Sequence, residues 1–295
     1  MLRILLTGGT GQIGSELRNT LSSLGEVLAP GRSRMNLEYP DSIRSAIREA
    51  KPGIIVNAAA FAAMDPAEAN PELALQVNGI GPGIIAEEAK RLGVLLVHYS
   101  TAYVFDGKAA RAYVEDDPPN PINAYGKSKL AGEKAILATG AAHVILRLSW
   151  VYSLRGSNFL TAFLKVAREK EAVPVVDDQT GAPTWARTVA EATAHIVAGW
   201  RPAGGATGTF HLSAAGMVTR CGFAKEVITA SGSAAGDGAL RAKVRPIASA
   251  EYPLPAMRPK YCVLDNTKAK RAFGIEMPDW KEQLRACMAQ GPADL

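Results

Sequence analysis

The chain has 295 residues, of which 47% are hydrophobic and 21% are charged. These fractions are typical of a globular protein with a substantial core and exclude intrinsic disorder. No run approaches the roughly 18 uninterrupted apolar residues that a membrane span needs. The net charge of +5 favours anionic ligands, but no dense basic run with interleaved aromatics points to nucleic acid.

The cysteines and histidines predict neither a metal site nor a disulfide framework. Cys221, Cys262 and Cys287 are scattered, and no Cys-x-x-Cys or Cys/His pairing occurs among them and the four histidines. The apolar start, Met1–Thr7, is too short for a signal peptide and reads as a buried strand. We therefore expect a cytoplasmic protein without a metal ion.

Short apolar runs alternate with amphipathic stretches through the first half of the chain. The expected strands are Arg3–Thr7, Glu26–Ala29, Ile54–Asn57, Leu95–Ser100 and Val144–Leu148. The expected helices between them are Gln12–Leu24, Pro40–Glu49, Pro71–Leu92 and Ala124–Ala138. Val-, Ile- and Leu-rich strands separated by helices predict an α/β fold, a Rossmann-type doubly wound parallel sheet covered on both faces.

Beyond about Leu154 the alternation becomes less regular. The expected helices are Asn158–Glu171, Pro183–Trp200, Arg220–Ala230, Asn266–Phe273 and Asp279–Ala289, with strands at Ala172–Asp177 and Thr209–Ser213. We predict a dinucleotide-binding domain over residues 1–154. Residues 155–295 are expected to form mainly a smaller α/β substrate-binding lobe, from which some segments return to the Rossmann sheet.

A glycine-rich loop follows the first expected strand and opens the first helix. Its sequence is Thr7-Gly8-Gly9-Thr10-Gly11-Gln12-Ile13-Gly14. Gly8 permits a tight turn, Gly11 lets a pyrophosphate approach the backbone, and Gly14 allows close packing of helix on strand. Free N–H groups and the helix dipole would then hold the anion.

The residues after the second strand indicate which dinucleotide is bound. An acidic residue there accepts a bond from the ribose 2′-hydroxyl of NAD. Here the strand runs into Gly31-Arg32-Ser33-Arg34, which has no carboxylate but two guanidinium groups able to pair with a 2′-phosphate. We predict NADP(H), with Arg32 as the main phosphate ligand, against the alternative that both arginines are surface residues.

Tyr125 and Lys129 lie four residues apart on an expected helix and so project from one face. An ammonium near a phenol favours the phenolate and lowers the tyrosine pKa. Such a tyrosine can protonate a carbonyl oxygen as hydride reaches the carbon. Ser100-Thr101 ends the apolar run of the fourth strand, where ligands collect in open α/β sheets, and would complete the site.

Together these motifs resemble the dTDP-4-dehydrorhamnose reductase family of the extended short-chain dehydrogenases/reductases. The matching segments span most of the chain: Gly8–Leu17, Val56–Ala60, His98–Thr101, Tyr103–Gly107, Pro121–Gly126, Lys129–Glu133, Arg147–Tyr152, Asn158-Phe159, Asp178–Thr184 and Arg258-Pro259.

The resemblance implies hydride delivery from NADPH to C4 of a nucleotide-linked 4-keto-6-deoxy sugar. Thr101 would bond the carbonyl oxygen, Tyr125 would supply the proton, and Lys129 would hold the nicotinamide ribose and lower the tyrosine pKa. The predicted cofactor contacts are Gly8, Thr10, Gly11, Gln12, Ile13, Arg32, Asn36, Leu37, Ala58, Ala59, Ala60, Tyr125 and Lys129. The predicted substrate contacts are Tyr103, Trp150, Asn158 and Arg258.

Several of these positions also have simpler interpretations. Trp150 could be core packing, Asn158 could cap the helix that follows it, and Arg258 could belong to a surface salt bridge instead of binding a diphosphate. The chain also departs from the family pattern at Ala62, Pro66, Ala102 and Tyr261. These departures lie on the substrate side, so the sugar and the base stay open, as does a homodimer.

Two other functions stay open at this point. A nucleotide-sugar epimerase or dehydratase is one, although such enzymes more often have an acidic residue after the second strand. A non-catalytic NADP-binding regulatory subunit is the other, because the regulatory subunit of methionine adenosyltransferase resembles these reductases.

Overall fold

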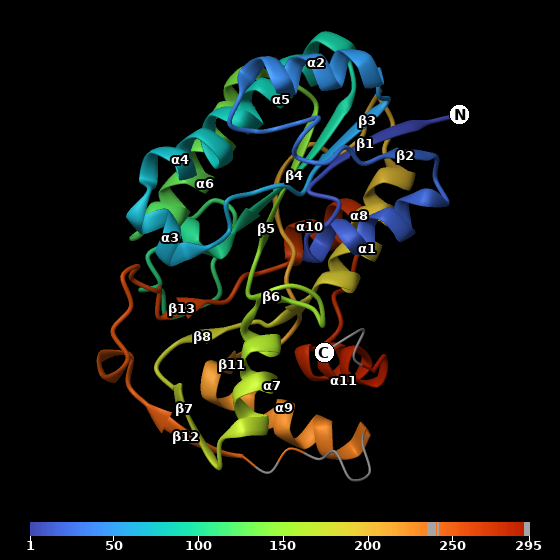
Figure 1. The fold of residues 1–295 in the computed structure, drawn as a ribbon. Coiled ribbons are helices and arrows are strands. Elements are labelled where there is room, and N and C mark those ends of the chain that lie inside the picture. The colour runs from blue at the N-terminus through green and yellow to red at the C-terminus, as the bar shows by residue number, and fades with distance from the viewer. Residues whose placement is uncertain (235–239, 241, 292–295) are drawn as a thin grey trace.

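The computed structural model describes residues 1–234, 240 and 242–291 (Figure 1). A six-stranded parallel sheet forms its centre, in the order β10-β5-β4-β3-β1-β2. The strands are β1 (Arg3–Thr7), β2 (Glu26–Leu28), β3 (Ile54–Asn57), β4 (Leu95–Thr101), β5 (His143–Leu148) and β10 (Gly208–His211). The predicted α/β class and doubly wound parallel sheet are confirmed.

Successive strand residues enter two separate cores because side chains alternate across a sheet. Ile4 and Leu6 pack with α1 (Gln12–Ser22), α8 (Ala186–Gly199) and α10 (Thr267–Phe273). Leu5 packs on the other face with α2 (Pro40–Ala50), α5 (Gly81–Leu92) and α6 (Ala124–Thr139). Helices on both faces explain why the central strands are apolar throughout.

The expected helix Pro71–Leu92 is interrupted by a wider turn. It consists of α4 (Pro71–Leu75), a π-helical turn at Gln76–Ile80, and α5. Asn78 within that turn is buried, donates to the Ser128 hydroxyl at 3.0 Å, and bonds the backbone of Phe61 at 2.8 and 3.0 Å. The turn thereby ties α6 to the loop after β3. That loop leads into a short helix the sequence did not predict, α3 (Met64–Ala69).

A smaller lobe lies below the main sheet in Figure 1. Its helices are α7 (Phe159–Glu169), α9 (Arg220–Ala234) and α11 (Trp280–Ala289), and they share a separate apolar core. Its short strands are β6 (Val151–Tyr152), β7 (Ala172–Val176), β8 (Thr180–Gly181), β9 (Thr184–Trp185), β11 (Val218–Thr219), β12 (Lys243–Ile247) and β13 (Tyr261–Cys262). In the described part of the chain, no helix is long and apolar enough to cross a membrane.

The sheet order places a ligand crevice at the ends of β1 and β3. From β1 the chain passes to β2 on one side and then to β3 on the other, and crevices form outside the carboxyl ends of strands at such a reversal. Thr7 and Asn57, the last residues of the two strands, are register partners. β10 lies beyond residue 154 yet joins this sheet beside β5.

Candidate active site

The glycine loop joins the end of β1 to the start of α1. Gly8 has a positive φ of 67°, and a Cβ atom there would lie 2.6 Å from the backbone nitrogen of Ala59. A Cβ atom at Gly14 would lie 2.0 Å from the carbonyl oxygen of Gly8. With no side chain at either position, the loop presses against the end of β3 and α1 starts directly behind β1.

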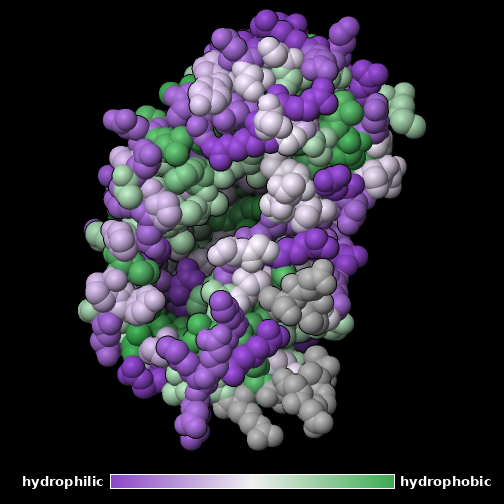
Figure 2. All heavy atoms as spheres, viewed as in Figure 1, coloured by the Kyte–Doolittle hydropathy of each residue, from purple (hydrophilic) through white to green (hydrophobic). Residues whose placement is uncertain are grey.

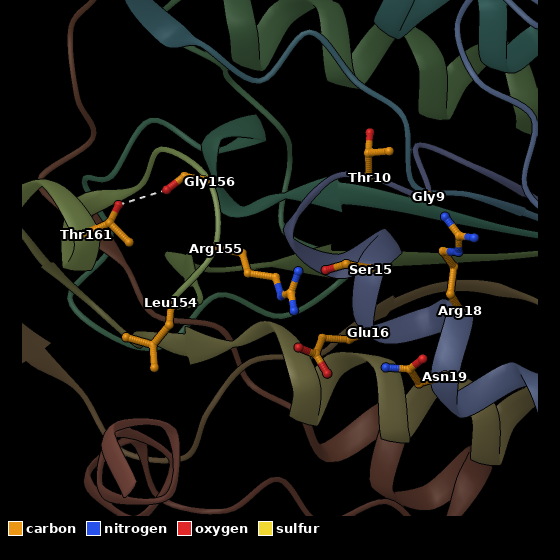
Figure 3. A pocket seen from close by; sticks show the side chains of 10 residues that line it. All are labelled: Gly9, Thr10, Ser15, Glu16, Arg18, Asn19, Leu154, Arg155, Gly156 and Thr161. Atoms are coloured by element: carbon orange, nitrogen blue, oxygen red, sulfur yellow. Dashed lines mark hydrogen bonds between the residues drawn. The ribbon is translucent and has the colours of Figure 1, made fainter. Parts of the chain in front are cut away.

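The first turn of α1 can bind an anion. Its N-cap is Gly11, and no side chain in the described ranges caps it. The first N–H groups of a helix have no partner within it, and the helix dipole makes this end positive. A cavity of about 840 Å³ lies alongside (Figure 3), lined by Gly9, Thr10, Ser15, Glu16, Arg18, Asn19, Leu154, Arg155, Gly156 and Thr161. These features fit the pyrophosphate of a dinucleotide.

The two arginines after β2 lie at the surface. Arg32 is exposed and pairs with Glu38, and Arg34 lies 3.3 Å from Glu49. Neither is locked in a buried contact, so each guanidinium is accessible to a phosphate. Arg18, which the sequence did not single out, lines the cavity, and its Cδ would lie 3.6 Å from a Cβ atom at Gly9.

The other residues predicted on this side differ in accessibility. Leu37 is buried in the core on the α2 face. Asn36 shapes the turn before α2, because its side chain accepts a bond from the Glu38 N–H at 3.0 Å. Ala58 and Ala59 are half-buried and Ala60 is exposed where the chain leaves β3.

The three predicted catalytic residues come together at the carboxyl end of β4. Thr101 ends that strand and is hydrogen-bonded to the phenol of Tyr125, the second residue of α6. Lys129 follows one helical turn later and is buried. The start of α6 is fixed by Asn123, whose Oδ1 accepts a bond from the Gly126 N–H at 2.7 Å.

The predicted lowering of the Tyr125 pKa by Lys129 is wrong. Burial raises the pKa of Tyr125 to about 12, and the hydrogen bond from Thr101 opposes this only partly. The Lys129 ammonium is directed instead at the ring of His98, 3.4 Å from Nε2. Burial lowers the pKa of Lys129 itself to about 8, against the attraction of Glu133.

A buried hydrogen-bonded chain runs from Lys129 to the glycine loop. The Nδ1 atom of His98 lies 3.0 Å from the amide nitrogen of Asn57, whose Oδ1 accepts a bond from the Thr7 hydroxyl at 2.6 Å. Burial and the Lys129 charge hold the pKa of His98 well below its usual range, so its ring is neutral. The sequence did not single out His98 or Asn57 as site residues, although a polar residue near the end of an apolar strand was the available signal.

Two of the predicted substrate residues, Tyr103 and Trp150, lie just beyond the carboxyl ends of β4 and β5. The rings of Tyr103 and Tyr125 are 6.1 Å apart, edge to face. Trp150 is half-buried with a positive φ of 44°, which is rare for a bulky residue. The guanidinium of Arg220 lies 4.2 Å from the centroid of the Trp150 ring. Figure 2 shows that this face of the molecule is hollowed between the main body and the smaller lobe.

Asn158 and Arg258 both have structural partners. Asn158 caps α7 through a capping box with Thr161, as the simpler interpretation held. Arg258 forms an ion pair with Asp65 of α3, with Nη2 2.9 Å from Oδ2. Its charge is therefore already compensated by a residue 193 positions away. Within the described ranges, no group of three or more His, Cys, Asp and Glu side chains could hold a metal ion.

Comparison with known proteins places this site in a family. The family model described as the RmlD substrate binding domain matches residues 2–292. A dTDP-4-dehydrorhamnose reductase of Burkholderia thailandensis is 43% identical over 97% of this chain and 98% of its own length. A solved dTDP-4-dehydrorhamnose reductase from Clostridium acetobutylicum is 32% identical, with a TM-score of 0.91 over 98% of this chain and 99% of that one.

A second solved dTDP-4-dehydrorhamnose reductase, from Bacillus anthracis in complex with NADP, is 29% identical, with a TM-score of 0.90. It covers 98% of this chain and 100% of that one. The glycine loop, the Thr101–Tyr125–Lys129 group and these full-length matches agree. The chain belongs to the dTDP-4-dehydrorhamnose reductase family.

Proposed function

We propose that this chain reduces the C4 keto group of dTDP-4-dehydro-L-rhamnose with NADPH, giving dTDP-L-rhamnose. The observation that carries the proposal is the gathering of Thr101, Tyr125 and Lys129 at the end of β4, beside the glycine loop. The full-length identity to named reductases supports the same reaction and cofactor.

Bound NADPH supplies the hydride, and residues of this chain manage the proton. The Tyr125 phenol donates its proton to the carbonyl oxygen as negative charge develops there. Thr101, already bonded to that phenol, holds the tyrosine and the carbonyl oxygen in line. Lys129, one turn along the same helix, would hold the nicotinamide ribose of the cofactor.

We assign cofactor binding to the glycine loop and the strand ends beside it. The amides of Gln12 and Ile13 would hold the pyrophosphate, Ala58 to Ala60 would flank the nucleotide, and Arg32 would pair with the 2′-phosphate. Tyr103 and Trp150 would face the nucleotide sugar. We also propose a homodimer, which sedimentation velocity of the purified chain would test.

The test is NADPH oxidation in the presence of freshly generated dTDP-4-dehydro-L-rhamnose. Tyr125→Phe should lower kcat by about 10²- to 10⁴-fold, the usual contribution of general acid catalysis, and should still bind NADPH through the glycine loop. Tyr39→Phe, at an exposed tyrosine, is the matched control and should behave as the unmodified chain.

Other outcomes would favour the alternatives. Conversion of the sugar without net NADPH consumption would indicate an epimerase. Tight NADPH binding without turnover, together with a copurifying enzyme, would indicate a regulatory subunit. Equal rates for Tyr125→Phe and the unmodified chain would refute the proposed proton donor.

A further inference from the structure

Among the described residues, Arg220, the first residue of α9, has only neutral partners. Its Nε donates to the side-chain oxygen of Gln179 at 2.9 Å, and its Nη2 donates to the Tyr103 hydroxyl at 3.2 Å. The guanidinium lies 4.2 Å from the Trp150 ring centroid and 5.6 Å from that of Phe159. Four side chains from separate segments thus hold one half-buried cation in place.

The charge of Arg220 is not compensated by an acid. Across the described ranges no carboxylate lies within ion-pair distance of it, whereas Arg258 nearby is paired with Asp65. The first turn of a helix is also an unfavourable position for a cation, because the dipole there is positive, and α9 has no acidic residue in that turn. The Arg220 guanidinium and the N-terminus of α9 together favour an anionic ligand.

The position of Arg220 relative to Tyr125 indicates which anionic group Arg220 would bind. The ring of Tyr103 lies between them: it packs edge to face with Tyr125, and its para-hydroxyl bonds Arg220. The ring of a hexopyranose is similar in length to the Tyr103 ring. In a nucleotide sugar the diphosphate is attached to C1, which lies opposite C4 across the sugar ring. With C4 at Tyr125, the diphosphate therefore falls near Arg220.

We propose that Arg220 binds the diphosphate of the nucleotide-sugar substrate, an inference that rests on the proposed function of the site. Trp150 and Gln179 then act as positioning residues, because they orient the guanidinium. The Trp150 ring is also in contact with Gly181, where a Cβ atom would lie 2.5 Å from it. Arg258, the cation that the resemblance suggested, keeps its structural pair with Asp65.

Calorimetric titration with dTDP and with thymidine tests this without requiring turnover. Arg220→Met should weaken dTDP binding by about 10- to 100-fold, because a charge-assisted hydrogen bond contributes about 1.5–3 kcal/mol. Thymidine affinity should stay the same. Arg220→Lys should recover part of the loss, since it restores the charge without the paired N–H donors of the guanidinium. Arg201→Met, at an exposed arginine, is the control.

NADPH affinity, measured on the same variants, shows whether Arg220 binds the diphosphate of the nucleotide sugar or the pyrophosphate of the cofactor. It should be unchanged, because the glycine loop holds the cofactor. A loss of NADPH affinity in Arg220→Met would assign this arginine to the cofactor and overturn the proposal. An unchanged dTDP affinity in Arg220→Met would overturn it as well.

The unmodified protein provides a second measurement that does not depend on a variant folding. Phenylglyoxal labels accessible arginines, and mass spectrometry locates the adducts. We expect dTDP, but not thymidine, to protect Arg220 while Arg201 is still labelled. Equal labelling of Arg220 with and without dTDP would refute the proposal. If dTDP protects Arg220 in a chain that never oxidises NADPH, the binding site stands and only the reductase assignment fails.

Discussion

The proposed cofactor side and the proposed substrate side of this molecule rely on different groups, one on backbone and the other on side chains. On the proposed cofactor side, backbone would do most of the binding: a glycine loop, the first turn of α1 and the ends of β1 and β3. On the proposed substrate side, Tyr103, Trp150 and Arg220 come from three distant segments, and Arg220 contacts the other two. Backbone sites depend on short local patterns, whereas side-chain sites depend on tertiary packing.

Lys129 lies where the two sides meet, and burial of its charge lowers the free energy of unfolding. Its pKa falls from 10.5 to about 8 on burial, so between these values the folded chain binds fewer protons than the unfolded chain. Stability from this group therefore rises with pH through that window, and the penalty is complete below pH 8.

Lys129→Met should separate activity from stability. We expect kcat to fall by about 10²-fold, because the side chain that would position the nicotinamide ribose is lost, and the free energy of unfolding at pH 7 to rise by about 2 kcal/mol. Urea unfolding at pH 7 and near pH 10 measures this, and the advantage of the variant should shrink at the higher pH. A variant that is less stable at pH 7 would mean that the bond to His98 outweighs the burial of charge.

The sequence predicts the cofactor side well for identifiable reasons. β1 and β3 begin and end where predicted because their Val, Ile and Leu residues are buried on both faces. Tyr125 and Lys129 are fixed by helical spacing alone. The spacing could not reveal that burial, and not Lys129, controls the tyrosine pKa, because that depends on where the ammonium is directed.

Features set by tertiary contacts could not be predicted. Periodicity runs unbroken through Gln76–Ile80, and the π-helical turn there reflects the partners of Asn78. The partner of Arg258 lies 193 residues away. Arg220 belongs to no motif, and its only local signal was a cation in the first turn of a helix. β10 has too short an apolar run to reveal that it joins the main sheet.

Gly14→Ala should damage the cofactor side through the backbone alone. The added Cβ would lie 2.0 Å from the Gly8 carbonyl oxygen, so α1 must move away from the loop. We expect NADPH affinity to fall by about 10- to 100-fold, equivalent to the 1–3 kcal/mol typical of overpacking. Fluorescence titration measures it. Gly31→Ala is the control, because a Cβ atom at Gly31 has no atom of the described residues within 4 Å apart from its chain neighbours.

If Gly14→Ala binds NADPH as the unmodified chain does, close approach of α1 to β1 is not what creates the anion site. A loss of dTDP affinity of the same size as the loss of NADPH affinity would instead show that the two sides are not independent. Either result would contradict the proposal that a separate backbone site holds the cofactor.

Arg32→Ala should have the smallest effect, because the side chain is 72% exposed and already pairs with Glu38. Interactions between exposed charges contribute about 0.2–1 kcal/mol, so we expect the preference for NADPH over NADH, as the ratio of kcat/KM values, to fall by a few-fold. Arg34→Ala, an equally exposed arginine paired with Glu49, is the matched control. An unchanged ratio for Arg32→Ala would shift the 2′-phosphate contact to Arg18, whose side chain lies against Gly9. The preference for NADPH over NADH would then depend on a contact that can be seen only in the folded chain.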